Sequence, residues 1–353
     1  MSEAYLAEIA EQPGILDRLG ARFAATWGAQ LAQLRAGLAA GRFDRVILTG
    51  MGGSLHGAHP AHLALSRALA VPVMLWESGE LTQQAPQAVT PRTLLIAISQ
   101  SGESGEVKRL TELPIRPAHA VTITNGPDNA LANWADLAIT TEAGPERTAS
   151  TKTYTAGLAA LHLCVAHLTG EDAGAGAEVQ AAAAVIARML EQMPAAARAA
   201  AAHLGHDAPL TVIGRGDSFG TAAMAALLIE EAAKLSCEAL TGGQFRHGPL
   251  ELVRMGFRAV VFTGDGPARP LTEALVTRIT ELGGRVVTIG TAPGNAPDSE
   301  TDAVLSLDLP EVAPGLLPLV EIIPVQYLVI PLALARGFEP AAFLNARKIT
   351  TGE

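Results

Sequence analysis

A serine-rich segment is the part of this sequence with the clearest capacity for ligand chemistry. Residues 99–104 (SQSGES) directly follow an apolar, strand-like run at residues 93–98. Hydroxyls, an amide and the N–H groups at the start of a helix can together satisfy the several acceptor oxygens of a phosphate. The sequence contains no Gly-Lys-Ser/Thr run of the nucleotide-binding P-loop, so it favours a phosphate on a small molecule over a nucleoside triphosphate with Mg²⁺. A solvated serine-rich turn is the alternative interpretation.

A second loop, residues 50–54 (GMGGS), also follows an apolar run and precedes a helical stretch. Its glycines would let backbone N–H groups approach an oxyanion, and Ser54 would add a hydroxyl. A tight turn without a ligand is the alternative. Leu55 departs from the glycine pattern of dinucleotide-binding loops, so we do not expect a nicotinamide cofactor.

A third loop, residues 144–152 (GPERTASTK), follows the last strand-like run of the first half. It leads into an apolar helical stretch that begins near Thr153. Ser150 and Thr151 are good helix N-caps, and capping is compatible with contact to a ligand in the same loop.

Acid–base chemistry is predicted in the second half of the chain. His247 lies in residues 243–249 (GQFRHGP) and precedes Gly-Pro, where helices do not continue, so we expect it to project from a loop. A histidine beside a carboxylate is an effective acid–base pair near neutral pH. Three candidate carboxylates lie upstream on one apparently helical stretch, and the residues alone leave the choice open among Glu230, Glu231 and Glu238.

Metal and disulfide chemistry are not expected. The histidines His56, His59 and His62 drift around a helix at three-residue spacing, and no acidic ligand accompanies them. The two cysteines, Cys164 and Cys237, cannot form a framework of disulfide bridges, which suits a reducing compartment.

Composition excludes several classes of protein. Of the 353 residues, 49% are hydrophobic and 17% are charged, a balance typical of globular enzymes and not of disordered chains. The net charge of −10 without a basic block argues against nucleic acid as the partner. The apolar run at residues 322–335 contains two prolines and is predicted to be too short and too broken to span a bilayer. The acidic N-terminus is unlike a secretory signal, and we therefore expect a cytoplasmic protein without a membrane span.

The elements that must position these loops occur twice. The strand–glycine–serine pattern at residues 45–54 returns at residues 211–218, and β-branched runs follow at matching distances in both halves. Short apolar strands alternate with helical segments in each half, which predicts parallel sheets with helices on both faces. In such sheets ligands bind beyond the carboxyl ends of the strands, where these loops lie.

The predicted organisation is therefore two duplicated α/β domains with helical additions. An alanine-rich helix from Ala177 to Ala202 is expected to lie between the domains, and one or two helices to precede them. The boundaries that we predict are an N-terminal helical segment at 1–35, a phosphate-binding domain at 36–172, a linker helix at 173–194, a second domain at 195–340 and a C-terminal active-site tail at 341–353.

Four of these motifs together resemble the double SIS (sugar isomerase) domain family, with the isomerase half of glutamine–fructose-6-phosphate amidotransferase and the phosphosugar deaminases and isomerases as the nearest likeness. They are SQSGES (99–104), ASTKTY (149–154), GRGD (214–217) and FRHGP (245–249), and the likeness covers about residues 40–353. The resemblance implies two tandem flavodoxin-like SIS domains, each a five-stranded parallel sheet flanked by helices.

The resemblance also implies a role for each candidate residue. Phosphate would be bound by Ser54, Ser99, Gln100, Ser101 and Ser104, and the sugar by Ser150. The family's catalytic glutamate, which moves a proton between C1 and C2, falls on Glu231. His247 would open the sugar ring and would reach the active site of a partner subunit in a homodimer. Lys348, in the terminal segment LNARK (344–348), would assist ring opening or form a Schiff base.

Two departures from the synthases bear on the reaction. Only about 40 residues precede the first SIS-like stretch, so we expect no glutaminase domain and no local source of ammonia. The synthase's lysine three residues before the catalytic glutamate is replaced here by Leu228. Both departures favour an isomerase or a deaminase (a hydrolase in amino sugar metabolism) that converts glucosamine 6-phosphate to fructose 6-phosphate and ammonia, without a cofactor or a metal.

Two alternatives remain open from the sequence. The substrate could be a fructosamine or galactosamine 6-phosphate, because selectivity depends on the shape of the pocket. The chain could also be a non-catalytic sensor or regulator that binds a sugar phosphate. The short acidic N-terminus offers no room for a DNA-binding fusion, and a sensor would have no use for Glu231, His247 and Lys348, so an enzyme is favoured.

Overall fold

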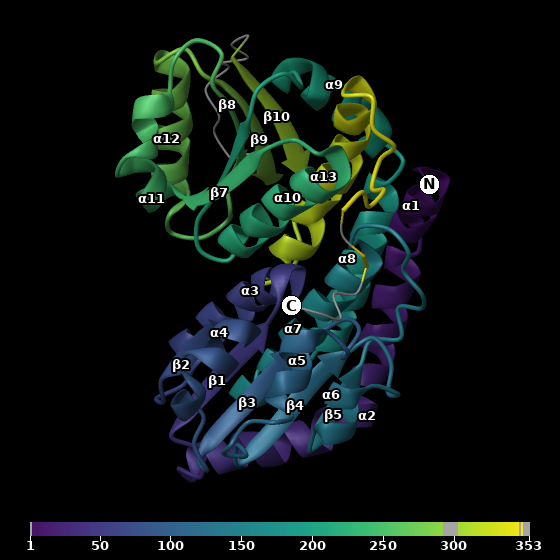
Figure 1. Ribbon diagram of the computed structural model, residues 1–353, viewed down its shortest axis with the longest axis vertical. Helices are drawn as coiled ribbons and strands as arrows, with labels where there is room; N and C mark the ends of the chain where they lie inside the picture. The colour runs from purple at the N-terminus through teal and green to yellow at the C-terminus, as the bar shows by residue number, and fades with distance from the viewer. Residues whose placement is uncertain (1, 292–302, 346, 349–353) are drawn as a thin grey trace. The chain divides into compact units, whose positions relative to one another are not determined.

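The structure is a computed structural model that describes residues 2–291, 303–345 and 347–348. It divides into two compact units, and each unit combines one long stretch of the chain with a short segment from one of its ends (Figure 1). Unit 1 comprises Met1–Ala10 and Val185–Leu344, and unit 2 comprises Glu11–Ala184 and Asn345–Glu353. Residues 346 and 349–353 of the predicted C-terminal tail lie outside the described residues.

Unit 2 contains a five-stranded parallel sheet in the order β2-β1-β3-β4-β5. Its strands are β1 (Arg45–Gly50), β2 (Val73–Glu77), β3 (Thr93–Ile98), β4 (His119–Thr124) and β5 (Leu137–Thr140). The central strand β3 is buried at every position, as expected of a strand covered on both faces. Gly50 is in register with Ile98, so β1 and β3 end side by side at the carboxyl edge of the sheet.

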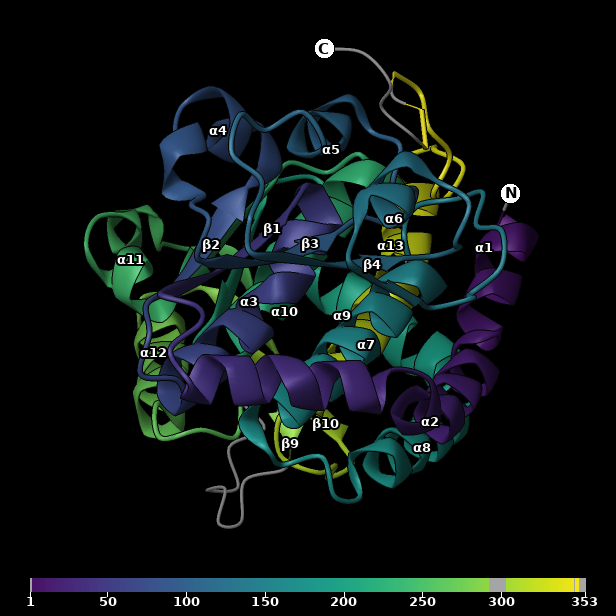
Figure 2. The same cartoon turned by 90° about the horizontal axis from the view of Figure 1, so that it is seen from below.

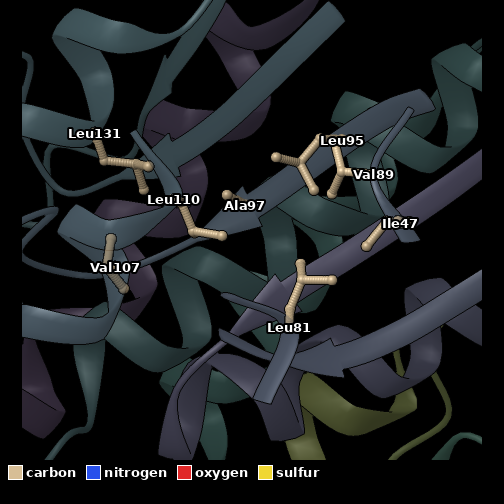
Figure 3. Close-up of a cluster of buried hydrophobic side chains, with 8 residues drawn as sticks. All are labelled: Ile47, Leu81, Val89, Leu95, Ala97, Val107, Leu110 and Leu131. Atoms are coloured by element: carbon tan, nitrogen blue, oxygen red, sulfur yellow. The ribbon is translucent and has the colours of Figure 1, made fainter. Parts of the chain in front are cut away.

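Helices cover both faces of this sheet. They are α2 (Gln12–Ala39), α3 (Gly52–Ala68), α4 (Ser78–Gln83), α5 (Gly105–Leu110), α6 (Ala130–Trp134) and α7 (Lys152–Thr169), with a short 3₁₀ turn η1 (Pro86–Ala88). On one face, Ile47, Leu95 and Ala97 of the strands pack against Leu81 of α4 and Val107 of α5 (Figure 3). On the other face α3 and α7 pack against each other, and the long helix α2 lies along α7 (Figure 2).

Unit 1 repeats the same architecture. Its strands are β6 (Leu210–Gly214), β7 (Cys237–Thr241), β8 (Arg258–Phe262), β9 (Arg285–Thr291) and β10 (Val304–Leu309). They form a parallel sheet in the order β10-β9-β8-β6-β7, which is the order of unit 2 written from the opposite edge. The predicted duplication and the flavodoxin-like strand order are both confirmed.

The helices of unit 1 also form two layers. The described helices are α1 (Ser2–Ala10), α9 (Met193–Leu204), α10 (Ser218–Ala233), α11 (Gly242–Arg246), α12 (Arg269–Glu281) and α13 (Leu317–Ala335), with a 3₁₀ turn η2 (Pro249–Leu252). Phe245 of α11 and Ile279 of α12 join Ile213 and Val261 of the strands in one core. On the other side α13 packs against α10 and α9.

Three expectations about individual elements are corrected. The alanine-rich segment is two helices, α8 (Ala175–Met189) and α9, because the chain breaks before Pro194, which occupies the first turn of α9. Glu238 lies on strand β7 and not on a helix with Glu230. The apolar run at residues 322–335 belongs to the longer helix α13, which continues through Pro324 and Pro331.

Helix α13 is thus long and apolar enough to cross a membrane by length and composition, and it is the one such helix among the described residues. It is also 83% buried within the protein over its most apolar window, which is typical of the core helix of a folded domain.

Candidate functional site

The first candidate loop turns tightly between β1 and α3. A Cβ atom on Gly50 would lie 3.0 Å from the carbonyl oxygen of Ile98 and 3.1 Å from the nitrogen of Leu55, so a side chain at this strand end would require the backbone of both neighbours to move by a few tenths of an ångström. Ser54 lies in the first turn of α3, where its N–H donates to the carbonyl of Met51 at 2.9 Å. This geometry places the Ser54 hydroxyl at the carboxyl edge of the sheet.

The loop at residues 99–104 lies at the same edge, because β3 is the hydrogen-bonded neighbour of β1. The Ser99 hydroxyl is buried and accepts a hydrogen bond from the N–H of Gly102 at 3.0 Å. The Ser101 hydroxyl accepts from the N–H of Glu103 at 3.2 Å. Ser104 is the N-cap residue of α5, and its side chain makes no capping hydrogen bond. The five predicted phosphate ligands, Gln100 among them, therefore come from two adjacent loops at one edge of one sheet.

Tertiary contacts hold this loop in shape. Gly102 has a φ of 64°, and a Cβ there would lie 1.9 Å from the Oδ1 atom of Asn129, so the position requires glycine. Asn129 in turn caps α6 by accepting from the N–H of Ala132 at 2.9 Å. The carbonyl of Gln100 accepts from the N–H of Asn125 at 3.0 Å. The loop is thus pre-organised by the neighbouring strand and helix.

The acidic residue of this loop is neutralised locally. Glu103 pairs with Lys108 at 2.6 Å and accepts from the N–H of Ala130 at 2.7 Å. The hydrogen bond from Lys108, followed by that from Ala130, holds the pKa of Glu103 below its ordinary value. The negative charge of Glu103 is therefore balanced by Lys108 of α5 and by a backbone N–H group at the start of α6.

The third loop contains a buried carboxylate that sequence reasoning missed. The Glu146 side chain is fully buried, and its Oε1 atom accepts from the N–H groups of Thr151 at 2.9 Å and Thr153 at 3.1 Å. Glu146 thereby caps the N-terminus of α7. Thr151 is the N-cap residue by backbone geometry, but its side chain makes no capping hydrogen bond. The signal available in the sequence was an acidic residue shortly before an apolar helix.

Two of the predicted site residues meet at this carboxylate. The Nζ atom of Lys348 lies 2.5 Å from the Oε2 atom of Glu146, 2.8 Å from the carbonyl oxygen of Thr148 and 3.2 Å from the hydroxyl of Ser150. Burial alone would raise the pKa of Glu146, but the charge of Lys348 and the hydrogen bonds from Lys348, Thr153 and Thr151 outweigh it, so this pKa is lowered. The C-terminal lysine is thus attached to the predicted sugar-binding loop within unit 2.

In unit 1, the three candidate glutamates occupy different environments. Glu231 is half-buried in the last turn of α10, beside Lys234, whose ammonium donates to the carbonyls of Glu231 and Ala342. Glu230 is exposed, and its Oε1 atom accepts from the N–H of Cys237 at 3.4 Å. Glu238 is exposed on β7. Glu231 is therefore the least exposed of the three candidates, and its role stays a prediction.

His247 ends the short helix α11, as its Gly-Pro context predicts. The helix begins with a capping box in which Thr241 and Gln244 exchange hydrogen bonds, and His247 is its exposed C-cap residue. Gly248 follows with a φ of 146°, which turns the chain into η2. The imidazole therefore projects from a fixed turn in unit 1.

A second buried carboxylate was also missed. Glu321 on α13 is fully buried and accepts from the hydroxyl of Ser218, at the start of α10, at 2.7 Å. Burial raises the pKa of Glu321 to about 8, and the nearby Asp265 and Asp217 act in the same direction, against the hydrogen bond from Ser218. It is the one charged residue of an otherwise apolar helix, which is a signal for a special environment.

Metal ligation has no candidate in the part of the chain that the structure describes, where no group of three or more His, Cys, Asp or Glu side chains could hold an ion. The rings of His59 and His62 lie 6.3 Å apart, and burial lowers the pKa of His62. These histidines form part of the packed surface of α3.

Comparison with known proteins identifies the family. A family model of the SIS domain matches residues 42–167 and again residues 207–336. The chain is 32% identical over 323 residues to the glutamine–fructose-6-phosphate aminotransferase of Pyrococcus horikoshii, a match that covers 88% of this chain and 52% of that protein. The chain spans about half the length of the curated relatives that it matches.

Solved structures agree on the fold. The C-terminal domain of glucosamine-fructose-6-phosphate aminotransferase from Francisella tularensis superposes with a TM-score of 0.84 at 22% identity, over 96% of this chain and 97% of that one. Glucosamine-6-phosphate deaminase from Thermotoga maritima superposes with a TM-score of 0.74 at 19% identity, over 99% of both chains. With two parallel five-stranded sheets in the same strand order and two matches to one family model, the chain belongs to the SIS domain family and carries two tandem copies of that domain.

Proposed function

We propose that this protein is a phosphosugar isomerase or deaminase that converts an amino-hexose 6-phosphate, with glucosamine 6-phosphate as the first candidate, to a ketose 6-phosphate and ammonia. The observation that carries the proposal is the pair of serine loops at the carboxyl edge of β1 and β3, in a chain that belongs to the SIS domain family. Two of the proteins that it resembles, a glutamine–fructose-6-phosphate aminotransferase and a glucosamine-6-phosphate deaminase, act on sugar phosphates, which supports a sugar phosphate as the ligand.

The phosphate would be bound by the loops of unit 2. Hydroxyls from Ser54, Ser99, Ser101 and Ser104 and the amide of Gln100 are suited to a group with several acceptor oxygens. A phosphate is unchanged during isomerisation, so these contacts act equally in the ground state and the transition state. Their contribution is to hold C1 and C2 in place, and such positioning can be worth about 7–11 kcal/mol of the barrier.

The chemical steps are assigned to three further residues. His247 would open the sugar ring by moving the proton of the C1 hydroxyl to the ring oxygen as the bond between C1 and the ring oxygen breaks. Lys348 would assist this opening, or would form a Schiff base with the open aldehyde that water returns to the aldehyde before proton transfer. Glu231 would then remove the proton from C2 and return it to C1. For an amino sugar this leaves an alcohol at C1 and a C2 imine, which water hydrolyses to the ketose phosphate and ammonia. The homodimer with a shared histidine, which the resemblance implies, belongs to this proposal.

The decisive test is turnover of glucosamine 6-phosphate by the purified chain. Release of ammonia and fructose 6-phosphate in equal amounts would support the proposal. Fructosamine and galactosamine 6-phosphates are the next substrates in the series. Thermal stabilisation by these sugar phosphates without turnover of any of them would overturn the catalytic proposal in favour of a non-catalytic binding protein.

A His247→Ala variant tests the assignment of ring opening. We expect a loss of about 100-fold or more in kcat on the cyclic substrate, the usual contribution of a general acid or base. An open-chain analogue that carries the same phosphate should keep most of its rate, because it needs no ring opening. The comparison is made by measuring kcat for both substrates in parallel, and an equal loss on both would exclude the role. His206→Ala, at a histidine in the loop before β6, is a matched control that should behave as wild type.

A further inference from the structure

The two carboxylate oxygens of Glu146 serve different partners. Oε1 accepts from the backbone N–H groups of Thr151 and Thr153 and so satisfies the start of α7. Oε2 accepts from the hydroxyl of Thr153 at 2.6 Å and from the ammonium of Lys348 at 2.5 Å. The backbone N–H groups at the start of α7 therefore use one oxygen, and the second oxygen accepts from Lys348 and from the Thr153 hydroxyl.

The buried carboxylate of Glu146 forms its ion pair with one specific cation, the ammonium of Lys348. A fully buried carboxylate is costly to leave without a compensating charge, and Lys348 is the one cation that forms an ion pair with Glu146 among the described residues. Lys152, the nearest lysine in sequence, is almost fully buried but pairs instead with Glu11 at 2.5 Å. The position of Lys348 is thus determined by a specific partner and not by general attraction to an acidic surface.

The remaining hydrogen bonds of Lys348 fix the direction of its side chain. An ammonium has three donors, and the three acceptors here are Oε2 of Glu146, the carbonyl of Thr148 and the hydroxyl of Ser150. Two of them belong to the loop whose geometry Glu146 itself maintains. The lysine is consequently held against the hydroxyl that the proposed function assigns to the sugar.

We propose that Glu146 is the positioning residue for Lys348: its Oε2 atom holds the ammonium beside Ser150, so that the C-terminal lysine is in place when the phosphosugar binds. This inference rests on the proposed function, because Lys348 and Ser150 are assigned to the sugar there. The inference assigns Glu146 a role toward Lys348 that neither the sequence motifs nor the composition of its loop indicated. Glu146 does not contact the substrate in this proposal and acts only through Lys348.

A Glu146→Gln substitution separates the two oxygens. The amide oxygen of glutamine can still accept from the N–H groups of Thr151 and Thr153, whereas the amide nitrogen would face the ammonium of Lys348 and repel it. Competitive acetylation with trace acetic anhydride, read by mass spectrometry, measures how accessible the Nζ atom of Lys348 is. We expect slow labelling of Lys348 in the wild type, where the side chain is 19% exposed, and labelling several-fold faster in Glu146→Gln.

The rate is measured on the same proteins with glucosamine 6-phosphate. Removing a charge-assisted hydrogen bond that positions Lys348 should lower kcat about tenfold or more. KM should change by less than about threefold, because the serine loops that bind the phosphate are untouched. Glu11→Gln, which removes the carboxylate paired with Lys152, should leave both kcat and the labelling of Lys348 at wild-type values.

A second variant distinguishes positioning from helix capping. Thr153→Val removes one hydrogen bond to Oε2 but keeps the carboxylate and the Lys348 pair, so we expect a lower Tm with unchanged labelling of Lys348 and unchanged kcat. If Lys348 is labelled at the wild-type rate in Glu146→Gln, Glu146 does not position it. If labelling rises but kcat is unchanged, the position of Lys348 does not matter to the reaction. A wild-type chain that turns over no phosphosugar would contradict the proposed function, and the labelling result would still decide whether Glu146 holds Lys348.

Discussion

Replacing Glu231 with glutamine is expected to abolish at least 99% of turnover while leaving substrate binding nearly intact. A general base contributes about 10²–10⁴-fold to a rate, and an amide of the same shape cannot accept the C2 proton. The substitution should preserve α10, because Glu231 is half-buried in the last turn, glutamine has the same shape, and the backbone carbonyl that accepts from the ammonium of Lys234 is kept. The loss should therefore appear in kcat and not in KM.

The clearest measurement for Glu231 is the exchange of the C2 proton. Substrate deuterated at C2 is followed by NMR in ordinary water, which reports proton removal separately from imine hydrolysis. The neighbouring Glu230→Gln is the matched control, since Glu230 is exposed and its carboxylate accepts only from the N–H of Cys237 among the contacts that the structure describes. Exchange by Glu231→Gln at more than about one tenth of the wild-type rate would contradict the assignment of the base, given the size of such effects.

Replacing Glu321 with glutamine is expected to change how the stability of unit 1 depends on pH. The carboxyl has a pKa of about 8 in the folded protein, against 4.5 for an unperturbed glutamate. Between pH 4.5 and about pH 8, Glu321 keeps its proton in the folded chain and loses it in the unfolded chain. The free energy of unfolding therefore falls as the pH rises through this range. The slope from this group is about 1.4 kcal/mol for each pH unit, and it vanishes above about pH 8.

Glutamine has no proton to lose, so the variant should lack this slope. We expect Glu321→Gln and wild type to have similar Tm values near pH 5, and the variant to be the more stable protein by several kcal/mol near pH 8. Scanning calorimetry from pH 5 to 9 measures the difference. Glu281→Gln, at an exposed position on α12 beside Arg278, is the control and should follow the wild-type curve. Parallel curves for wild type and Glu321→Gln would show that the carboxyl is ionised throughout.

The fold could be predicted from the sequence because its signals are local and occur twice. Apolar runs of strand length that end in glycine, such as those ending at Gly50 and Gly214, mark strands that the duplicated sheets confirm. The register of β1 with β3 then brings Ser54 and the loop at residues 99–104 to one edge, as the general rule for parallel sheets requires. The roles of these residues remain predictions.

The features that could not be predicted depend on partners that are distant in sequence. Glu146 is one acidic residue in a polar loop until its contact with Lys348, at the far end of the chain, is known. Glu321 is similar, because its partner Ser218 belongs to another helix. The break between α8 and α9 had a local signal in Pro194, whereas Pro324 and Pro331 do not interrupt α13, because tertiary packing keeps this apolar stretch helical through both.

The contact between Glu321 and Ser218 indicates how the two copies of the domain have diverged. Ser218 occupies in unit 1 the place that Ser54 occupies in unit 2, at the same spacing after the glycine that ends the first strand. In unit 1 its hydroxyl is used by a carboxyl from α13, whereas the matching turn of α7 in unit 2 carries only Ala156 and Gly157. An internal carboxyl therefore takes the hydroxyl that an incoming anion would need, and ionisation of that carboxyl would repel the anion further. The two copies of the domain are thus asymmetric. In unit 1 the serine after the first strand donates to an internal carboxyl, so we expect the phosphate site of the proposed function in unit 2 and not in unit 1.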